Sequence, residues 1–139
     1  MEKSWTYLQP LRIPGGWNVM FNQFASLDPE TLPPDDRRWL FFFVEDILYI
    51  YTDHTRKRNK QVETQRLAID LGWYPDGDPE GAFRLEAILD EDWENPLLTF
   101  ESRSRQEIVD TIECWLFREF MPNYFIDEEI FRRNHRRKT

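Results

Sequence analysis

The clearest pattern of hydrophobic and polar positions lies in the middle of the chain. Apolar residues recur at every second position at Leu67, Ile69 and Leu71, and again along residues 83–89. Side chains at positions i and i+2 of a strand share one face, so each segment predicts a strand with one face in the core. Residues 73–81 (WYPDGDPEG) lie between them and are rich in turn formers, so we expect a β-hairpin.

Flanking segments predict further short strands, because they are rich in aromatic or branched side chains. The expected strands are Trp5–Ile13, Trp17–Phe24, Arg38–Val44, Ile47–Thr52 and Leu97–Glu101. The Glu45-Asp46 dipeptide lacks the glycine that a tight turn prefers, so a bulged strand or a buried helix also fits that region. Residues 26–37 and 53–65 are polar and are expected to be loops.

The C-terminal part of the chain predicts helices. Ser104 and Glu107 have the spacing of a capping box, in which each side chain satisfies a free amide at the start of a helix. Pro122 is expected to end this helix, and a shorter helix is expected from Asp127, with acids first and arginines last, as the helix dipole favours. The first helix carries an apolar stripe formed by Ile108, Val109, Ile112, Trp115, Leu116 and Phe120.

These elements predict an α+β fold: an antiparallel sheet of about five to seven strands packed by a C-terminal amphipathic helix. The chain of 139 residues is long enough for one domain, so we expect a single domain over residues 1–139. Residues 132–139 are strongly basic and are expected to form a mobile tail.

Composition places the chain among folded, cytoplasmic proteins. Six Trp, five Tyr and eleven Phe give it far more bulky apolar groups than a disordered chain has. A single cysteine cannot form an internal disulfide, and the N-terminus shows no apolar signal segment. The longest apolar run is residues 39–44, well below the roughly 20 residues that cross a bilayer, so we expect no membrane contact.

The charge is negative overall and uneven. The formal net charge is −8, and without residues 132–139 the chain has 13 basic against 26 acidic groups. An acidic body repels the phosphate backbone, so we do not expect direct binding of nucleic acid. A partner with a basic surface is favoured.

The acidic groups concentrate around the predicted hairpin. Residues 70–94 hold nine acidic side chains against one arginine, with two tryptophans and a tyrosine among them. Charge steers the encounter with a basic partner and aromatic rings supply contact area, so this region is the expected binding site. The expected contact residues are Trp73, Tyr74, Asp76, Asp78, Glu80, Asp90, Glu91, Asp92, Trp93 and Glu94.

Other chemical signals are weaker, and we expect no catalytic residues, no metal and no cofactor. Residues 76–83 resemble the start of a calcium loop, but its twelfth position is Ala87 where a glutamate should close the shell. His54 is expected on a polar surface loop and His135 in the basic tail, neither at metal-ligand spacing. Cys114 falls away from the apolar stripe, either exposed or covered by residues 124–126.

Three stretches, Leu11–Pro29, Ala68–Leu89 and Trp93–Leu116, resemble a group of small bacterial immunity proteins in their order and spacing. Such proteins are paired with toxins of contact-dependent inhibition and other polymorphic toxin systems. The resemblance implies a non-enzymatic inhibitor that binds the toxic domain of its cognate partner in the cytoplasm. Immunity proteins against nucleases are commonly acidic, because a nuclease must be basic to hold its substrate.

The leading hypothesis is therefore an immunity protein that neutralises a toxin domain, with a nuclease as the favoured target. Two alternatives from other classes stay open at this point. One is an enzyme that uses clustered carboxylates and a divalent metal. The other is a housekeeping protein- or nucleic-acid-interaction module that uses the basic tail.

Overall fold

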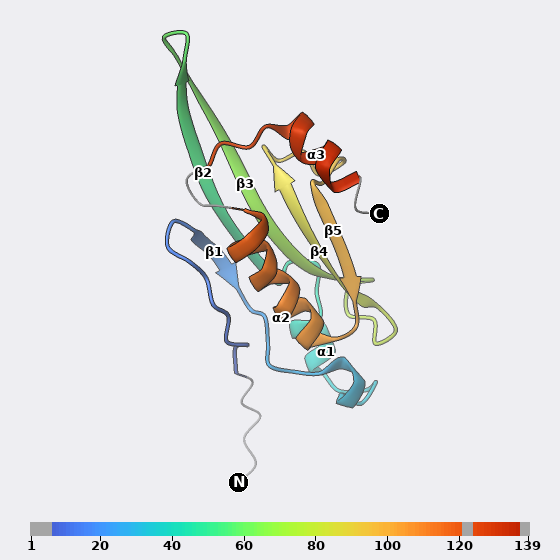
Figure 1. Cartoon of the computed structure of the whole chain (residues 1–139). Coiled ribbons are helices and arrows are strands. Elements are labelled where there is room, and N and C mark those ends of the chain that lie inside the picture. The colour runs from blue at the N-terminus through green and yellow to red at the C-terminus, as the bar shows by residue number, and fades with distance from the viewer. Residues whose placement is uncertain (1–6, 121–123, 137–139) are drawn as a thin grey trace.

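The computed structural model describes residues 7–120 and 124–136. At its centre is a five-stranded antiparallel sheet with strand order β1-β2-β3-β4-β5, so each strand pairs with its neighbour in sequence (Figure 1). The strands are β1 (Asn18–Asn22), β2 (Leu48–Arg58), β3 (Gln61–Tyr74), β4 (Ala82–Leu89) and β5 (Leu98–Ser102). The expected α+β class, the hairpin of β3 and β4, and a strand count within the expected range are confirmed.

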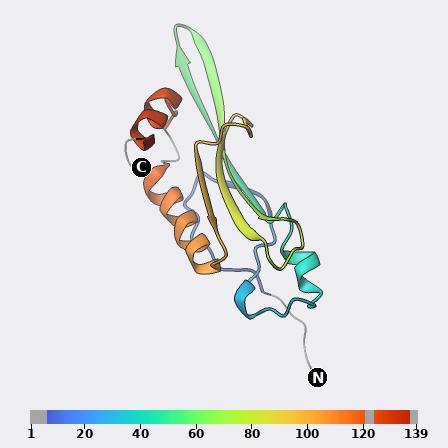
Figure 2. The same cartoon turned by 90° about the vertical axis from the view of Figure 1, so that its right-hand side faces the viewer.

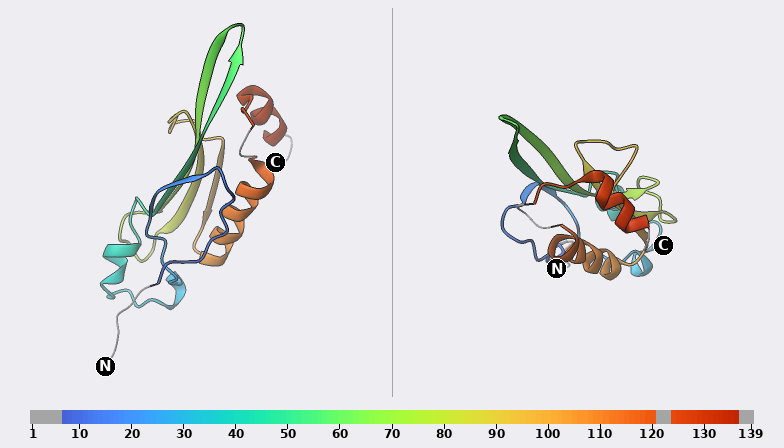
Figure 3. Two further views of the ribbon diagram at one scale, coloured as in Figure 1. Left: turned by 90° about the vertical axis from the view of Figure 1, so that its left-hand side faces the viewer. Right: turned by 45° about the horizontal axis from the view of Figure 1, so that its top comes forward.

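Two C-terminal helices lie on the same side of this sheet (Figures 2 and 3). They are α2 (Arg105–Cys114), which continues as the π-helical turn η2 (Trp115–Glu119), and α3 (Glu128–Arg136). The 3-10 turn η1 (Pro29–Thr31) and the short helix α1 (Arg38–Phe42) lie near the end of the sheet where β3 turns into β4 (Figure 1).

The main core lies between α2 and one face of the sheet. Trp73, Leu71 and Ile69 of β3 are fully buried there, as are Ile108 and Ile112 of α2. Burying each such side chain stabilises the fold by about 1.5–3 kcal/mol relative to leaving it exposed. The apolar stripe expected on this helix is therefore the surface that holds it against the sheet.

Helix α2 begins as its sequence predicts. The Ser104 hydroxyl accepts the Glu107 backbone N–H at 3.1 Å, as in a capping box. The Glu107 carboxylate does not reach back directly: it accepts the Ser102 hydroxyl, which in turn accepts the Ser104 backbone N–H at 2.9 Å. Pro122, expected to end the helix, lies outside the described residues.

The expected strand Arg38–Val44 is wrong, because this segment forms α1. The Asp36 carboxylate accepts the Arg38 backbone N–H at 2.9 Å, which satisfies a free amide of the first turn. Trp39 and Phe43 lie four residues apart and so point to one side of the helix, where both are buried with ring centroids 4.5 Å apart. Tertiary packing of these two rings overrides the strand preference of the segment.

The expected loop 53–65 is also wrong. Strands β2 and β3 continue through it as a two-stranded arm that projects beyond the rest of the sheet (Figure 1). Asn59 and Lys60 turn the arm with positive φ angles of 51° and 65°, the conformation of a tight hairpin turn. Cross-strand pairs such as Arg56 with Glu63, whose charged groups lie 2.9 Å apart, stabilise this ribbon. Its polar composition is the reason that the sequence predicted a loop instead.

At the N-terminus, the expected strand Trp5–Ile13 is wrong over the described residues 7–13, which form only an isolated bridge between Leu8 and Ala25. The shorter C-terminal helix is confirmed as α3, with acids in its first turn and basic groups in its last. Residues 132–136, expected to be part of a mobile tail, belong to α3. None of the helices in the described part of the chain is long and apolar enough to cross a membrane.

Replacing Gly72 with alanine should destabilise the protein by about 1–3 kcal/mol. A Cβ at this position would lie 2.2 Å from the Glu45 backbone oxygen, so the connection between α1 and β2 would have to shift. The matched control is Gly15→Ala, because a Cβ there meets nothing within 4 Å. Urea unfolding measures both variants, and equal stabilities would contradict the close approach.

Candidate partner-binding surface

The face of the sheet opposite α2 carries the candidate site, and we call it the open face. Strand alternation places a row of paired residues across all five strands: Phe21, Tyr49, Asp70, Glu86 and Thr99. The helices α2 and α3 lie on the other side of the sheet (Figures 2 and 3). The open face further includes Tyr51, Arg66, Ala68, Tyr74, Arg84, Ile88 and Glu101, with Glu91 and Trp93 from the β4–β5 connection.

One half of the open face is aromatic. Tyr49 packs with Ala68 and Ile88 in a small cluster separate from the main core. Its ring lies 6.1 Å from Phe21 and 6.3 Å from Trp93, measured between centroids. Trp93 remains 47% exposed, so about half of its surface is open to solvent.

The β4–β5 connection places this indole. Asp90 and Glu91 adopt positive φ angles of 52° and 59°, a left-handed conformation that reverses the chain after β4. The Trp93 backbone N–H then donates to the Glu91 carbonyl at 3.0 Å. This tight turn brings the indole back against Tyr49.

Asp70 occupies the middle of the row and is only 8% exposed. Among the described residues, no group donates a hydrogen bond to its carboxylate or forms an ion pair with it. Burial raises the pKa of Asp70 to about 7, and the negative charges of Asp46 and Glu86 act in the same direction. The Asp70 carboxylate therefore has little contact with water and no counter-charge among the described residues.

Arg66 and Arg84 of the open face form ion pairs with carboxylates other than Asp70. The Arg66 guanidinium binds Asp53 at 2.8 Å and lies 4.0 Å from the centre of the Tyr51 ring. The Arg84 guanidinium binds Glu101 at 2.9 Å and lies 4.6 Å from the centre of the Tyr74 ring. Each arginine therefore sits between a carboxylate and an aromatic ring.

The expected contact residues fall into two groups at opposite ends of β4. Trp73 and Tyr74 end β3 and residues 76–80 lie in the turn to β4, whereas residues 90–94 follow the last residue of β4. A strand of 8 residues spans roughly 25 Å, so the two groups do not form one continuous acidic cluster.

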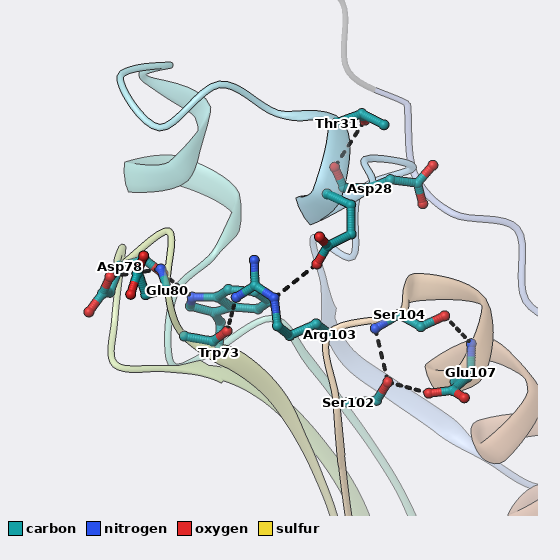
Figure 4. Close-up of polar contacts among 11 residues, drawn as sticks. Asp28, Thr31, Trp73, Asp78, Glu80, Ser102, Arg103, Ser104 and Glu107 are labelled. Carbon is teal, nitrogen blue, oxygen red and sulfur yellow. Dashed lines mark hydrogen bonds and ion pairs between the residues drawn. The ribbon is translucent and has the colours of Figure 1, made fainter.

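Trp73 has a structural role in the first group. Its side chain is fully buried, and the indole N–H donates to the Asp78 carbonyl at 2.7 Å (Figure 4). The Arg103 guanidinium lies 5.4 Å from its ring centre and is held by Glu30 at 2.9 Å. A buried ring of this kind shapes the turn and offers no contact surface to a partner.

The other residues of the first group differ in exposure. Asp76 and Glu80 are exposed, whereas Asp78 is half-buried and accepts the Glu80 backbone N–H at 2.8 Å (Figure 4). Tyr74 is half-buried beneath Arg84 on the open face, and burial raises the pKa of its hydroxyl. In the part of the chain described, no group of three His, Cys, Asp or Glu side chains could hold a metal ion.

The second group contributes more to the open face. Glu91 faces Tyr49, and its charge helps to raise the pKa of that hydroxyl after burial itself. Asp90 accepts the Arg66 backbone N–H at 2.8 Å, and Asp92 accepts from the Asn95 side chain at 3.3 Å, so both support the local chain. Glu94 is exposed.

Of the aromatic and acidic residues on the open face, the sequence predicted Tyr74, Glu91 and Trp93 as contact residues. It did not predict Tyr49, Tyr51 or the buried Asp70. Residues 48–51 alternate aliphatic and tyrosine side chains, a pattern that predicts one aliphatic and one aromatic face. Asp70, placed among buried apolar neighbours along β3, was a further signal. Asp46 gave no such signal, because its approach to Asp70 depends on the α1–β2 connection.

His54 and Cys114, to which the sequence assigned no function, can also be placed in the structure. His54 was expected on a surface loop, which is wrong: it lies on β2, is 5% exposed, and neither ring nitrogen bonds to a described residue. Cys114 is a free, exposed cysteine at the end of α2.

Replacing Asp70 with asparagine should stabilise the protein at pH 8 but not at pH 4. The folded-state pKa of about 7 exceeds the unfolded value near 3.8, so ionising Asp70 destabilises the native state, and this contribution is absent at low pH and grows as the pH rises from about 4 to 7. Asparagine carries no charge, so the variant should gain up to about 4 kcal/mol above pH 7. Urea unfolding at both pH values tests this, and an equal effect at both would contradict it.

Comparisons with known proteins provide no relative for this chain. No protein family, curated protein sequence or solved structure matches it.

Proposed function

We propose that this chain is an immunity protein that binds and neutralises a cognate bacterial toxin domain in the cytoplasm. The favoured target is a nuclease, because a nuclease presents the basic surface that the charge of this chain complements. Inhibition is stoichiometric and non-enzymatic. The resemblance of the three sequence stretches to immunity proteins supports the same function.

The observation that carries this proposal is the combination of side chains on the open face. An indole that is 47% exposed lies against Tyr49, which pairs with the buried Asp70, and the surrounding arginines are already paired. An aromatic anchor with neighbouring acidic groups is the composition that favours a cationic protein partner. Long-range attraction would speed the encounter, and burial of the indole would slow release.

The proposed interface is therefore centred on the open face and the β4–β5 connection. Trp93 and Glu91 remain contact residues, and Tyr49, Asp70 and Glu86 join them. The exposed acids Asp76 and Glu80 lie at the far end of the sheet and act mainly through the field of the protein.

Replacing Trp93 with alanine should weaken toxin binding by about 2 kcal/mol or more, because the anchor loses its ring. The matched control is Phe117→Ala, since Phe117 is 50% exposed but lies on η2, on the covered side of the sheet. The partner used is the C-terminal domain encoded by the gene immediately upstream. Calorimetric titration gives the affinities, and equal losses in both variants would remove the open face from the interface.

Growth rescue tests the function itself. Cells that express this upstream-encoded domain should stop growing, and co-expression of the chain should restore growth. The Phe117→Ala variant should protect as well as the native chain does, whereas Trp93→Ala should protect less at matched expression. Growth arrest that the native chain fails to relieve would overturn the proposal.

A second candidate function, contact with nucleic acid, is favoured by one feature of the arm. Lys57, Arg58 and Lys60 are exposed near its tip, and a two-stranded β-ribbon fits the DNA major groove. Replacing all three with serine should leave protection against the toxin unchanged, because the tip of the arm lies beyond the end of the sheet (Figure 1). Gel-shift assays with duplex DNA and single-stranded RNA test the alternative, which requires binding by the native chain that the serine variant loses.

A further inference from the structure

We propose that Asp70 receives a single arginine side chain of the bound partner, which supplies the counter-charge that this chain lacks. The inference rests on the proposed function and specifies the chemistry of its interface. Asp70 is 8% exposed on the open face and has no cationic partner among the described residues.

The open face contains three pairs of a carboxylate and an aromatic ring, and two of them already hold an arginine. Arg66 lies between Asp53 and the Tyr51 ring. Arg84 lies between Glu101 and the Tyr74 ring. The third pair is Asp70 and Tyr49, which face each other directly across β3 and β2.

In the described residues, no arginine or lysine of this chain fills that third position. A guanidinium would bind the carboxylate and stack on the Tyr49 ring, as Arg66 and Arg84 do at the neighbouring pairs. The aliphatic stem of the incoming arginine would pack along the indole of Trp93, which lies 6.3 Å from Tyr49.

The groups that face Asp70 also favour a cation. Glu86 lies opposite on β4, Tyr49 lies opposite on β2, and Asp46 approaches from the connection between α1 and β2. Tyr74 lies four positions further along β3 than Asp70, and the charge of Asp70 adds to burial in raising the pKa of the Tyr74 hydroxyl. Burial, followed by the negative charges of Asp46 and Glu86, favours a proton on Asp70 when no cation is bound, and the same two charges attract a cation.

An arginine therefore competes with a proton for the same carboxylate. Binding should release that proton, and affinity should rise with pH until Asp70 is fully ionised. A metal ion is a poorer match, because three suitable ligands do not come together anywhere in the described residues. A neutral hydrogen-bond donor would not offset the repulsion from Asp46 and Glu86.

A hexa-arginine peptide tests the inference without knowledge of the toxin. Its dissociation constant is measured by calorimetry at low ionic strength at pH 6, 7 and 8. The native chain should bind up to about tenfold more tightly at pH 8 than at pH 6, because Asp70 changes from mostly protonated to mostly ionised. Two buffers of different ionisation enthalpy report the proton released.

Two isosteric variants distinguish binding of an arginine at Asp70 from general attraction between the basic peptide and the acidic protein. Asp70→Asn should bind more weakly than the native chain at pH 8 and lose the pH dependence. Asp110→Asn removes the same charge from an exposed position on α2, on the other side of the sheet, and should behave like the native chain. Equal behaviour of the two variants would overturn the inference.

Growth rescue then distinguishes this inference from the proposed function. One outcome is that the native chain and Asp70→Asn neutralise the upstream-encoded toxin equally well and bind it with equal affinity. In that case the proposed arginine site at Asp70 is wrong and the immunity function stands. If hexa-arginine binds as described but the native chain fails to neutralise that toxin, the arginine site stands and the immunity function is wrong.

Discussion

The structure depends on the packing of one amphipathic helix against one face of an antiparallel sheet. The apolar stripe of α2 buries Ile108 and Ile112 against the alternate apolar residues of β3 and β4. Because a strand sends successive side chains to opposite faces, this packing also determines which residues face away from the helix. The open face is the direct consequence, because it receives the strand residues that point away from the main core.

The open face has a small buried apolar cluster of its own, although neither α2 nor α3 covers it. Ile88 is fully buried and Tyr49 is nearly so, because Phe21, Tyr51 and Trp93 surround them. The acidic groups beside these rings outnumber the arginines available to pair with them. A surface that is well packed yet left with uncompensated negative charge is suited to completion by a basic partner.

Asp70 illustrates the cost of such a surface. A buried carboxylate without a counter-charge lowers the stability of the free protein at neutral pH. Binding sites often retain residues that stability alone would disfavour, since the same groups are stabilised when the partner binds. The raised pKa of Asp70 follows from its burial and from the charges of Asp46 and Glu86, and the proposed arginine of the partner would supply the counter-charge that is absent from the described residues.

The sequence by itself determined the elements whose hydrophobic period is unambiguous: the β3–β4 hairpin, the cap and stripe of α2, and the α+β class. It also determined the acidic surplus, whereas the exposure of the Trp93 indole is known only from the structure. Only the tertiary structure decided that residues 38–42 are helical, since Trp39 and Phe43 pack on a core that is distant in sequence. It also decided that the two acidic groups lie at opposite ends of β4 and that Asp46 approaches Asp70. Spacing along a chain specifies which side of one element a residue occupies, whereas proximity between elements depends on how they pack.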